Sequence, residues 1–464
     1  MEQDFEHQYD PALEKFEAML ESDETYFFEP EEYTSIIEHY LDNTHFNKAQ
    51  KAIIIATEQY PLDIDIKLLH VELLIIKNKS EKALVLLDEL QIMDPKNDEV
   101  YTQKAAIYSK RSEHKKAISF LKMALKCVSS PEDVCDINSQ LGVEYMHSND
   151  LDLAKECFIQ CLKENKEDYT SLYSVIHCFE FMEEHREAVV FLNSYLETNP
   201  YSEIAWHQLA RQYVYLNMPE EALISIDFAI YSDDQFTGAY LEKAKILENM
   251  NAYEEAIELY KTVLDLENPT AFTYLRMGKC YEKLGDIKRA QGCLQRSVHE
   301  DPLLGKGWMT LAEFHYRLGD YKKTRGYVQK AIDIDSENIL CWMLAAENNI
   351  RIKSYDDAIT AYLRVIELGF TDIATCCKLI DIYIIMRRYQ EALSFTVERC
   401  NMFPDDLSLK MRLVAIYFKI SDTEKGRFHL LEILKKVPSI KKQILQLFPF
   451  LNDNKVALGI LNAY

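Results

Sequence analysis

Several features are scarce in this sequence, and each scarcity excludes a class of protein. Glycine and proline occur only 12 times each among 464 residues, which argues against long linkers and against the many turns of an all-β protein. Apolar runs such as residues 52–56 are too short to cross a bilayer. The first residues, MEQDFEHQYD, lack a basic stretch followed by an apolar core. We therefore expect neither membrane insertion nor a secretory signal.

Positive charge is also in short supply. The chain has 52 Lys and Arg against 76 Asp and Glu, which gives a net charge of −24. Nucleic-acid binding relies on clustered cations that displace counterions, so we expect no nucleic-acid partner. The 11 cysteines are odd in number and widely scattered, which suits a reducing compartment better than a disulfide framework. The protein is accordingly predicted to be cytoplasmic.

The dominant positive feature is an internal repeat. Residues 271–302 and 305–336 align without a gap at a period of 34, and each holds two amphipathic stretches separated by Leu-Gly-Asp. A period of this length indicates stacked helical repeats. Twelve units can be placed, beginning at Pro30, Ile64, Asp98, Cys135, Tyr169, Glu203, Thr237, Ala271, Gly305, Ile339, Ile373 and Leu407. The third interval has three extra residues near 129–134, which are expected between helices, where an insertion costs little.

Particular positions of the 34-residue unit keep one kind of side chain. Position 8 is Ala or Gly in seven units, position 11 is aromatic in eight, and position 32 is proline in six. Position 20 is alanine in ten units: Ala49, Ala83, Ala117, Ala154, Ala188, Ala222, Ala256, Ala290, Ala358 and Ala392. A small residue at positions 8 and 20 would let the two helices of a unit approach closely. Where Ile37, Val71, Ile380 and Val414 occupy position 8, wider spacing is predicted.

These residues resemble the tetratricopeptide repeat. The resemblance implies an all-α, right-handed superhelical solenoid of about twelve helix-turn-helix repeats with helical caps. The chain, including Tyr26-Phe27-Phe28, also looks like uncharacterised long cytosolic repeat proteins of Bacteroidota. We predict an acidic N-terminal capping helix and linker at 1–29, the repeats at 30–438 and capping helices at 439–464. Asp10, Ser439 and Asn452 are the predicted helix caps.

The two ends of the chain differ in charge. The first 60 residues carry 15 acidic and three basic side chains, whereas residues 401–464 carry ten basic and six acidic ones. Head-to-tail self-association could follow from this asymmetry, and independent end caps are the simpler interpretation. The acidic start could equally be a solvated cap or a docking surface for a basic partner.

The resemblance also implies a binding face. In that family the first helix of each unit lines a concave groove, with positions 2, 5, 9, 12 and 13 pointing into it. Cations recur there in the central units, and an acidic segment of a partner protein or peptide is their expected ligand. The cations are Arg211, Lys245 and Lys279 at position 9, and Lys283, Arg317 and Arg351 at position 13. Tyr173, His177 and His207 are expected beside them.

A solvated face is the competing interpretation of the same residues. Glu313 with Arg317, and Glu347 with Arg351, are four apart on a helix and could neutralise one another. The pairs Lys245–Glu248 and Lys279–Glu282 are three apart and could do the same.

Catalytic motifs are missing. The sequence has no GxxxxGK[ST], GxGxxG, GxSxG or HExxH. Cys157 and Cys161 are one helical turn apart and could share a metal, but they occupy packing positions of a second helix. We expect no enzyme, no cofactor and no metal. The predicted function is a non-enzymatic scaffold or adaptor, and the alternative is a peptide-responsive sensor that changes superhelical pitch.

Overall fold

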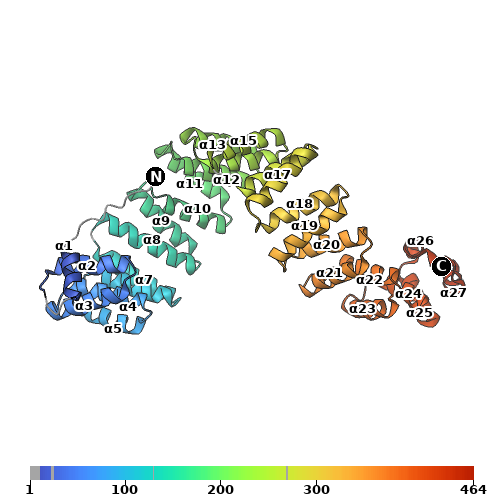
Figure 1. Cartoon of the computed structure of the whole chain (residues 1–464), viewed down its shortest axis with the longest axis horizontal. Coiled ribbons are helices and arrows are strands. Elements are labelled where there is room, and N and C mark those ends of the chain that lie inside the picture. The colour runs from blue at the N-terminus through green and yellow to red at the C-terminus, as the bar shows by residue number, and fades with distance from the viewer. Residues whose placement is uncertain (1–10, 22–25, 129, 268–269, 464) are drawn as a thin grey trace. The chain divides into compact units, whose positions relative to one another are not determined.

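The computed structural model describes residues 11–21, 26–128, 130–267 and 270–463. Within these ranges every regular element is a helix, and no strand occurs (Figure 1). Asp10, the predicted cap of the first helix, lies outside the described residues. The predicted all-α fold class is confirmed. The chain divides into two compact units, unit 1 up to Glu242 and unit 2 from Lys243, and each is described by itself.

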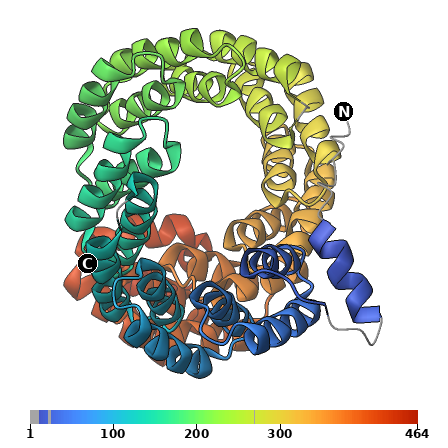
Figure 2. The ribbon, with the colours of Figure 1, turned by 90° about the vertical axis from the view of Figure 1, so that its left-hand side faces the viewer.

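Unit 1 opens with α1 (Pro11–Glu21) and continues as antiparallel helix pairs. In its green stretch, from α10 to α13, Figure 2 shows the helices side by side in two layers. The pairs are α2 (Pro30–Asp42) with α3 (Phe46–Gln59), α4 (Ile64–Ile76) with α5 (Ser80–Met93), α6 (Asp98–Lys110) with α7 (His114–Cys127), α8 (Pro131–His147) with α9 (Leu151–Glu164), α10 (Tyr169–Phe181) with α11 (His185–Thr198), and α12 (Glu203–Tyr215) with α13 (Pro219–Ser232).

Unit 2 continues the same pairing. The boundary between the units falls inside α14 (Thr237–Asn249), which is followed by α15 (Tyr253–Leu266). The remaining pairs are α16 (Ala271–Lys283) with α17 (Ile287–Glu300), α18 (Gly305–Arg317) with α19 (Tyr321–Ile334), α20 (Ile339–Arg351) with α21 (Tyr355–Glu367), α22 (Ile373–Ile385) with α23 (Tyr389–Met402), and α24 (Leu407–Lys419) with α25 (Thr423–Lys436). In the described chain, eleven of these first helices begin at the residue predicted from the period.

Each pair turns at the same place. Position 15 of every repeat has a positive φ, between 57° and 80°, and this left-handed conformation ends the first helix and reverses the chain. Glycine is present there in Gly285 and Gly319, and asparagine, which tolerates the conformation, in four repeats.

Many of the first helices begin with a side-chain cap. The caps are Asp63, Asn97, Asp168, Ser202, Thr270, Asn338, Asp372 and Asp406, each accepting from a backbone N–H of the first turn.

The helix pairs are held by buried small residues. All ten alanines at position 20 are fully buried. The two helices of a pair come closest in α6/α7, α8/α9, α12/α13, α16/α17, α18/α19 and α20/α21, which all have Ala or Gly at position 8. They are further apart in α2/α3, α4/α5, α10/α11, α22/α23 and α24/α25, which have Ile or Val there. In these eleven pairs of described helices, the spacing follows the residue at position 8 as predicted.

The three extra residues of the third interval, which precede the predicted start of the fourth repeat at Cys135, do not lengthen a loop. They extend α8, which has 17 residues where the other first helices have 13, and α8 begins at Pro131. Proline suits the first turn because its missing N–H has no helical partner to lose there. The prediction of a loop insertion was therefore wrong, because Pro131 lets the helix start one turn early.

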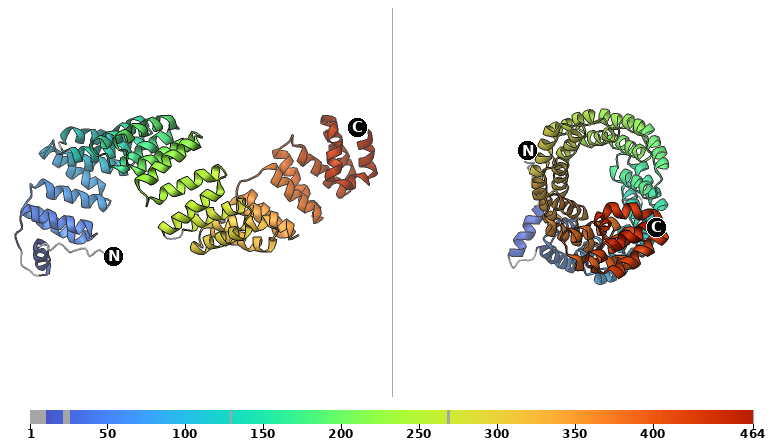
Figure 3. Two further views of the ribbon diagram at one scale, coloured as in Figure 1. Left: turned by 90° about the horizontal axis from the view of Figure 1, so that it is seen from above. Right: turned by 90° about the vertical axis from the view of Figure 1, so that its right-hand side faces the viewer.

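Helical segments cover both ends of the repeat array. Phe16 of α1 is fully buried, with its ring 5.8 Å from that of Phe28 and 6.3 Å from that of Tyr33. The C-terminal end of unit 2, red in Figure 3, contains two short 3₁₀ turns (Pro438–Ile440 and Pro449–Asn452), α26 (Lys441–Leu447) and α27 (Lys455–Ala463).

Two of the predicted C-terminal caps are wrong. Ser439 lies inside a 3₁₀ turn and caps no helix. Asn454, rather than Asn452, accepts hydrogen bonds from the backbone N–H groups of Val456 and Ala457 at the start of α27.

One buried polar side chain is expected to make stability depend on pH. His315 of α18 has position 11, is 2% exposed, and neither ring nitrogen has a hydrogen-bond partner. Burial lowers the pKa of His315, and nearby Lys323 lowers it further, while Asp320 opposes the shift. The neutral ring is thus favoured in the folded protein, whereas the unfolded chain takes up a proton near its ordinary pKa of about 6.5.

We expect the free energy of unfolding to fall as the pH drops below about 6.5 and to level off below the folded pKa of His315. Above pH 7 the contribution of His315 to the free energy of unfolding is fully present. His315→Phe, which places an aromatic ring at position 11 as Phe179 does, should flatten the pH dependence between pH 5 and 7. Urea denaturation of both proteins across this range measures the difference. An unchanged slope in His315→Phe would contradict the assignment.

Candidate partner-binding site

The predicted site residues all lie on first helices. Among the described helices, the first helices of successive repeats contact one another more than the second helices of successive repeats do. Examples are α2 with α4 and α10 with α12 in unit 1, and α16 with α18 and α22 with α24 in unit 2. A stack bends toward the side where its members approach more closely, so within each unit the first helices lie on the inner side. Unit 1 holds Tyr173, His177, His207 and Arg211, and unit 2 holds Lys245, Lys279, Lys283, Arg317 and Arg351.

In unit 1 the predicted cation is already engaged. The guanidinium of Arg211 lies 3.4 Å from the carboxylate of Glu180 on α10 and donates to Gln208 at 3.1 Å. Gln212 also donates to Glu180, at 2.9 Å. Arg211 therefore links two successive first helices, which is a structural role. A partner carboxylate would have to compete with Glu180 for it.

The aromatic residues predicted beside Arg211 differ in exposure. Tyr173 and His177 of α10 are exposed, and the ring of His177 lies 6.3 Å from that of Phe181. His207 is half-buried and meets Phe236 edge-on at 5.3 Å. The rings of Tyr173 and His177 are thus accessible on α10, whereas that of His207 is partly covered.

In unit 2 both predicted arginines have partners. Arg317 makes two hydrogen bonds to Glu282 of the preceding first helix, at 2.8 and 2.9 Å, while Glu313 on its own helix is 3.9 Å away. A hydrogen bond to Tyr316 raises the pKa of Arg351. The expected pairing along one helix is therefore largely replaced by bonds between repeats. Likewise Glu347 binds Lys378 at 2.6 Å.

The lysines of α16 are left without such partners. Glu282, the expected partner of Lys279, is bound to Arg317. In the described part of unit 2, no carboxylate lies within ion-pairing distance of Lys279 or Lys283. Burial lowers the pKa of Lys279, and the charge of Lys306 lowers it further. Two neighbouring cations without a bound carboxylate disfavour each other and favour an anion between them.

These side chains border a hollow on the inner side of α16 and α18. Its volume is ≈ 460 Å³, and it is lined by Lys279, Glu282, Lys283, Glu313 and Arg317. The hollow brings together three of the cations predicted from the sequence. The carboxylate of Glu282 is occupied by Arg317, and Glu313 only partly offsets the charge at Lys279, so positive charge prevails at the two lysines.

Sequence reasoning missed Lys306. It stands at position 2 of its repeat, which is one of the positions expected to point inward, and it is exposed. Its charge adds to burial in lowering the pKa of Lys279, which places the two lysines near each other. Reading position 2 together with positions 9 and 13 of the preceding repeat would have found it.

One group of side chains has ligand atoms close enough for a metal. The sulfur atoms of Cys135 and Cys161 and a carboxylate oxygen of Asp168 lie within 4.8 Å of one another. These groups have structural roles already: Cys161 donates to the carbonyl oxygen of Cys135, and Asp168 caps α10. Burial raises the pKa of Cys161 to about 12, which favours the thiol over the metal-binding thiolate. Cys157 is not a member of this group.

Comparison with known sequence families identifies the repeats. Models of the tetratricopeptide repeat match residues 136–168, 237–269 and 272–303. The chain contains tetratricopeptide repeats. The model of anaphase-promoting complex, cyclosome, subunit 3 matches residues 307–365, within the repeat array. The recognised repeats and the observed helix pairs together indicate a protein–protein interaction scaffold.

Individual proteins are similar over limited stretches. The general transcriptional corepressor ssn6 of Schizosaccharomyces pombe is 28% identical over 109 residues, which is 23% of this chain and 10% of that protein. The crystal structure of the APC/C hetero-tetramer Cut9–Hcn1 is 15% identical at a TM-score of 0.38, covering 87% of this chain and 92% of that one. YrrB, described as a TPR protein with an unusual peptide-binding site, is 17% identical at a TM-score of 0.32, covering 38% and 92%. At such TM-scores these likenesses carry no functional argument.

Proposed function

We propose that this tetratricopeptide-repeat chain is a non-enzymatic, cytoplasmic scaffold or adaptor. The inner face of unit 2 would bind an acidic segment of a partner protein or peptide. The observation that supports this proposal is the cluster of Lys279, Lys283 and Lys306. Among the residues that the structure describes, none of these lysines is ion-paired with a carboxylate, although the net charge of the chain is −24. Elsewhere on this face, the arginines and Lys378 are bonded to acceptors of neighbouring repeats.

Binding would follow from the electrostatics of these lysines. A carboxylate entering the hollow lies near Lys279 and Lys283, and it offsets the repulsion between Lys279 and nearby Lys306. Lys279 is half-buried, so its charge is less screened by water than that of an exposed lysine. A concave wall focuses the field of several cations on one ligand. The bond between Arg317 and Glu282 keeps the wall of the hollow in place.

Charge reversal tests the site. The double variant Lys279→Glu/Lys283→Glu should weaken binding of a labelled glutamate-rich peptide by about ten-fold or more at low salt, because each replacement turns attraction into repulsion. Fluorescence anisotropy across a salt series measures the affinity. Wild-type affinity should also fall as salt rises, since the contact is charge-based.

A matched control uses lysines on second helices of the same unit. Lys288→Glu/Lys322→Glu makes the same change in net charge, at exposed positions of α17 and α19. This variant should bind the peptide nearly as well as wild type. If both double variants bind equally, the effect reports overall charge only, and the site assignment is wrong. Circular dichroism confirms that each variant is folded.

A further inference from the structure

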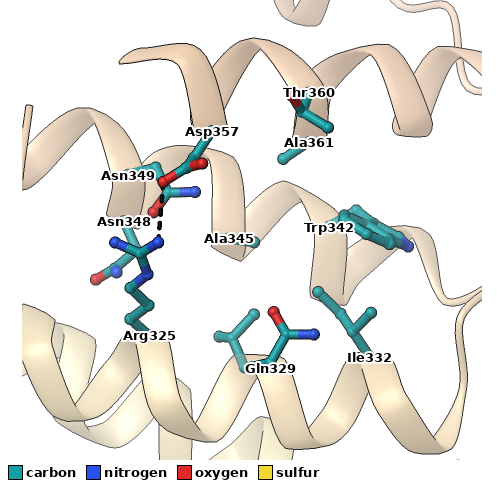
Figure 4. Close-up of a pocket in the computed structure, with 11 residues that line it drawn as sticks. Arg325, Gln329, Ile332, Trp342, Ala345, Asn348, Asn349, Asp357, Thr360 and Ala361 are labelled. Carbon is teal, nitrogen blue, oxygen red and sulfur yellow. Dashed lines mark hydrogen bonds and ion pairs between the residues drawn. The ribbon is translucent and has the colours of Figure 1, made fainter. Parts of the chain in front are cut away.

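A second site stands apart from the lysine cluster. Position 11 is aromatic in eight of the twelve repeats, but in α20 it is Asn349. A cavity of ≈ 160 Å³ lies beside it, between α19, α20 and α21. Figure 4 shows side chains of these three helices facing one another across it. A cavity of about 150 Å³ can hold a molecule the size of benzene. The missing ring therefore leaves room for a small ligand.

The cavity wall has unused hydrogen-bond acceptors. Asn348 and Asn349 are 1% and 8% exposed, and the Oδ1 atom of each has no partner. Asn348 donates its amide nitrogen to the carbonyl oxygen of Tyr321 at 3.1 Å, and this bond fixes which end of its amide is the oxygen. Buried polar atoms without partners are rare in folded proteins and call for an explanation. A ligand carrying N–H donors would provide the missing hydrogen-bond partners of these two oxygens.

The charged groups of the wall restrict the ligand further. Arg325 of α19 and Asp357 of α21 also line the cavity and form an ion pair at 2.9 Å, with side chains 57% and 48% exposed. A simple anion or cation would meet one matching and one opposing charge here. A zwitterion can match both. The wall therefore favours a ligand with one positive and one negative group.

Apart from Gln329 and Thr360, the remaining wall is apolar. Trp342, Ala345 and Ile332 line it, and the indole N–H of Trp342 is already donated to the carbonyl oxygen of Ser336 at 2.9 Å. The ring is thus free to contribute apolar contact without an unsatisfied donor. A small hydrocarbon side chain fits this part of the cavity.

We propose that this cavity binds a free α-amino acid. Its ammonium group donates to the asparagine oxygens and to Asp357, its carboxylate binds Arg325, and its side chain lies against Trp342. No residue of this site belongs to the lysine cluster of the inner face. The proposal therefore does not rest on partner binding.

A panel of the twenty L-amino acids, added singly to the full chain, tests the proposal by thermal shift and by calorimetry. One amino acid or a small set should raise the melting temperature, because a ligand that binds only the folded state stabilises it. The N-acetyl and methyl-ester derivatives of each hit, which lack one of the two charges, should bind at least about ten-fold more weakly.

Two variants locate the site. Asn349→Tyr restores the residue that most repeats have at position 11, so it should fold, fill the cavity and abolish binding. Arg325→Gln changes only a half-exposed side chain and should weaken binding by about ten-fold or more. If no amino acid binds wild type, the cavity holds ordered water only and the proposal is overturned. Undiminished binding to both variants would overturn it as well. Should Asn349→Tyr fail to fold, Arg325→Gln decides the outcome.

Discussion

Arg276→Ala should lower the free energy of unfolding by about 3 kcal/mol, because it leaves a buried carboxylate without its cation. Arg276 of α16 binds Glu248 of α14 through two nitrogens, at 2.6 and 3.0 Å, and the Tyr260 hydroxyl donates to the same carboxylate at 2.6 Å. The side chains of Arg276 and Glu248 are only 25% and 13% exposed. Burial raises the pKa of Tyr260, so it remains a donor at every physiological pH.

The matched control is Arg317→Ala. Arg317 and Glu282 form the same two-bond pair between the same kinds of helices, but their side chains are 52% and 20% exposed. Water can solvate Glu282 once the arginine is gone, so the loss should stay below about 1 kcal/mol. Urea denaturation followed by circular dichroism compares the two variants. Equal losses would show that burial does not set the value of these pairs.

A further variant separates the effect of losing the ion pair from the effect of leaving a buried carboxylate without its cation. Replacing both charged partners by apolar residues, as in Arg276→Met/Glu248→Leu, removes the stranded charge as well as the ion pair. Such replacements are often neutral, so this double variant should recover much of the loss seen in Arg276→Ala. A double variant as unstable as Arg276→Ala would mean that the loss comes from the broken hydrogen bonds, including that of the Tyr260 hydroxyl, rather than from an uncompensated charge.

The fold could be predicted from the sequence because each helix pair is specified locally. Two features decide the pairing of helices: the alanine of position 20 and the left-handed turn of position 15. Both lie within one repeat, so the period alone places the helices. The exception is α8, where Pro131 added a turn at the start of the helix. A proline compatible with both a loop and a first turn leaves that choice open until the packing is known.

The charged face was harder to predict, because the partners of its side chains come from other repeats. The sequence suggested Lys279 with Glu282, and Arg317 with Glu313. In the structure Arg317 binds Glu282, which is 35 residues away along the chain. Arg388 likewise pairs with Asp356, 32 residues away, and Lys155 with Glu184, 29 residues away. In a stacked array, residues about one period apart face each other as closely as residues one helical turn apart. Side-chain geometry decides which of the two pairings forms. A helical-wheel argument within one repeat does not contain this geometry.

Gly142→Val should cost about 1–3 kcal/mol through overpacking of the closely spaced pair α8/α9. A Cβ atom built on Gly142 would lie 2.6–2.9 Å from three ring carbons of Phe158, which is 1% exposed. Those ring atoms sit in the core and cannot move aside freely. The backbone of Gly142 is helical, so the change itself adds no backbone strain.

The repeats themselves indicate the compensating change. Position 24 holds the residue that faces position 8, and more than one combination fits: Gly142 faces Phe158, whereas α4/α5 combines Val71 with Leu87 and α16/α17 combines Gly278 with Leu294. Phe158→Leu should therefore recover much of the stability lost in Gly142→Val, by recreating the second combination. As a control, Gly326→Val places the same side chain in α19 where a Cβ meets nothing within 4 Å. It should change stability by less than about 0.5 kcal/mol. If Phe158→Leu gives no recovery, helix spacing in this solenoid is set by something other than the fit between positions 8 and 24.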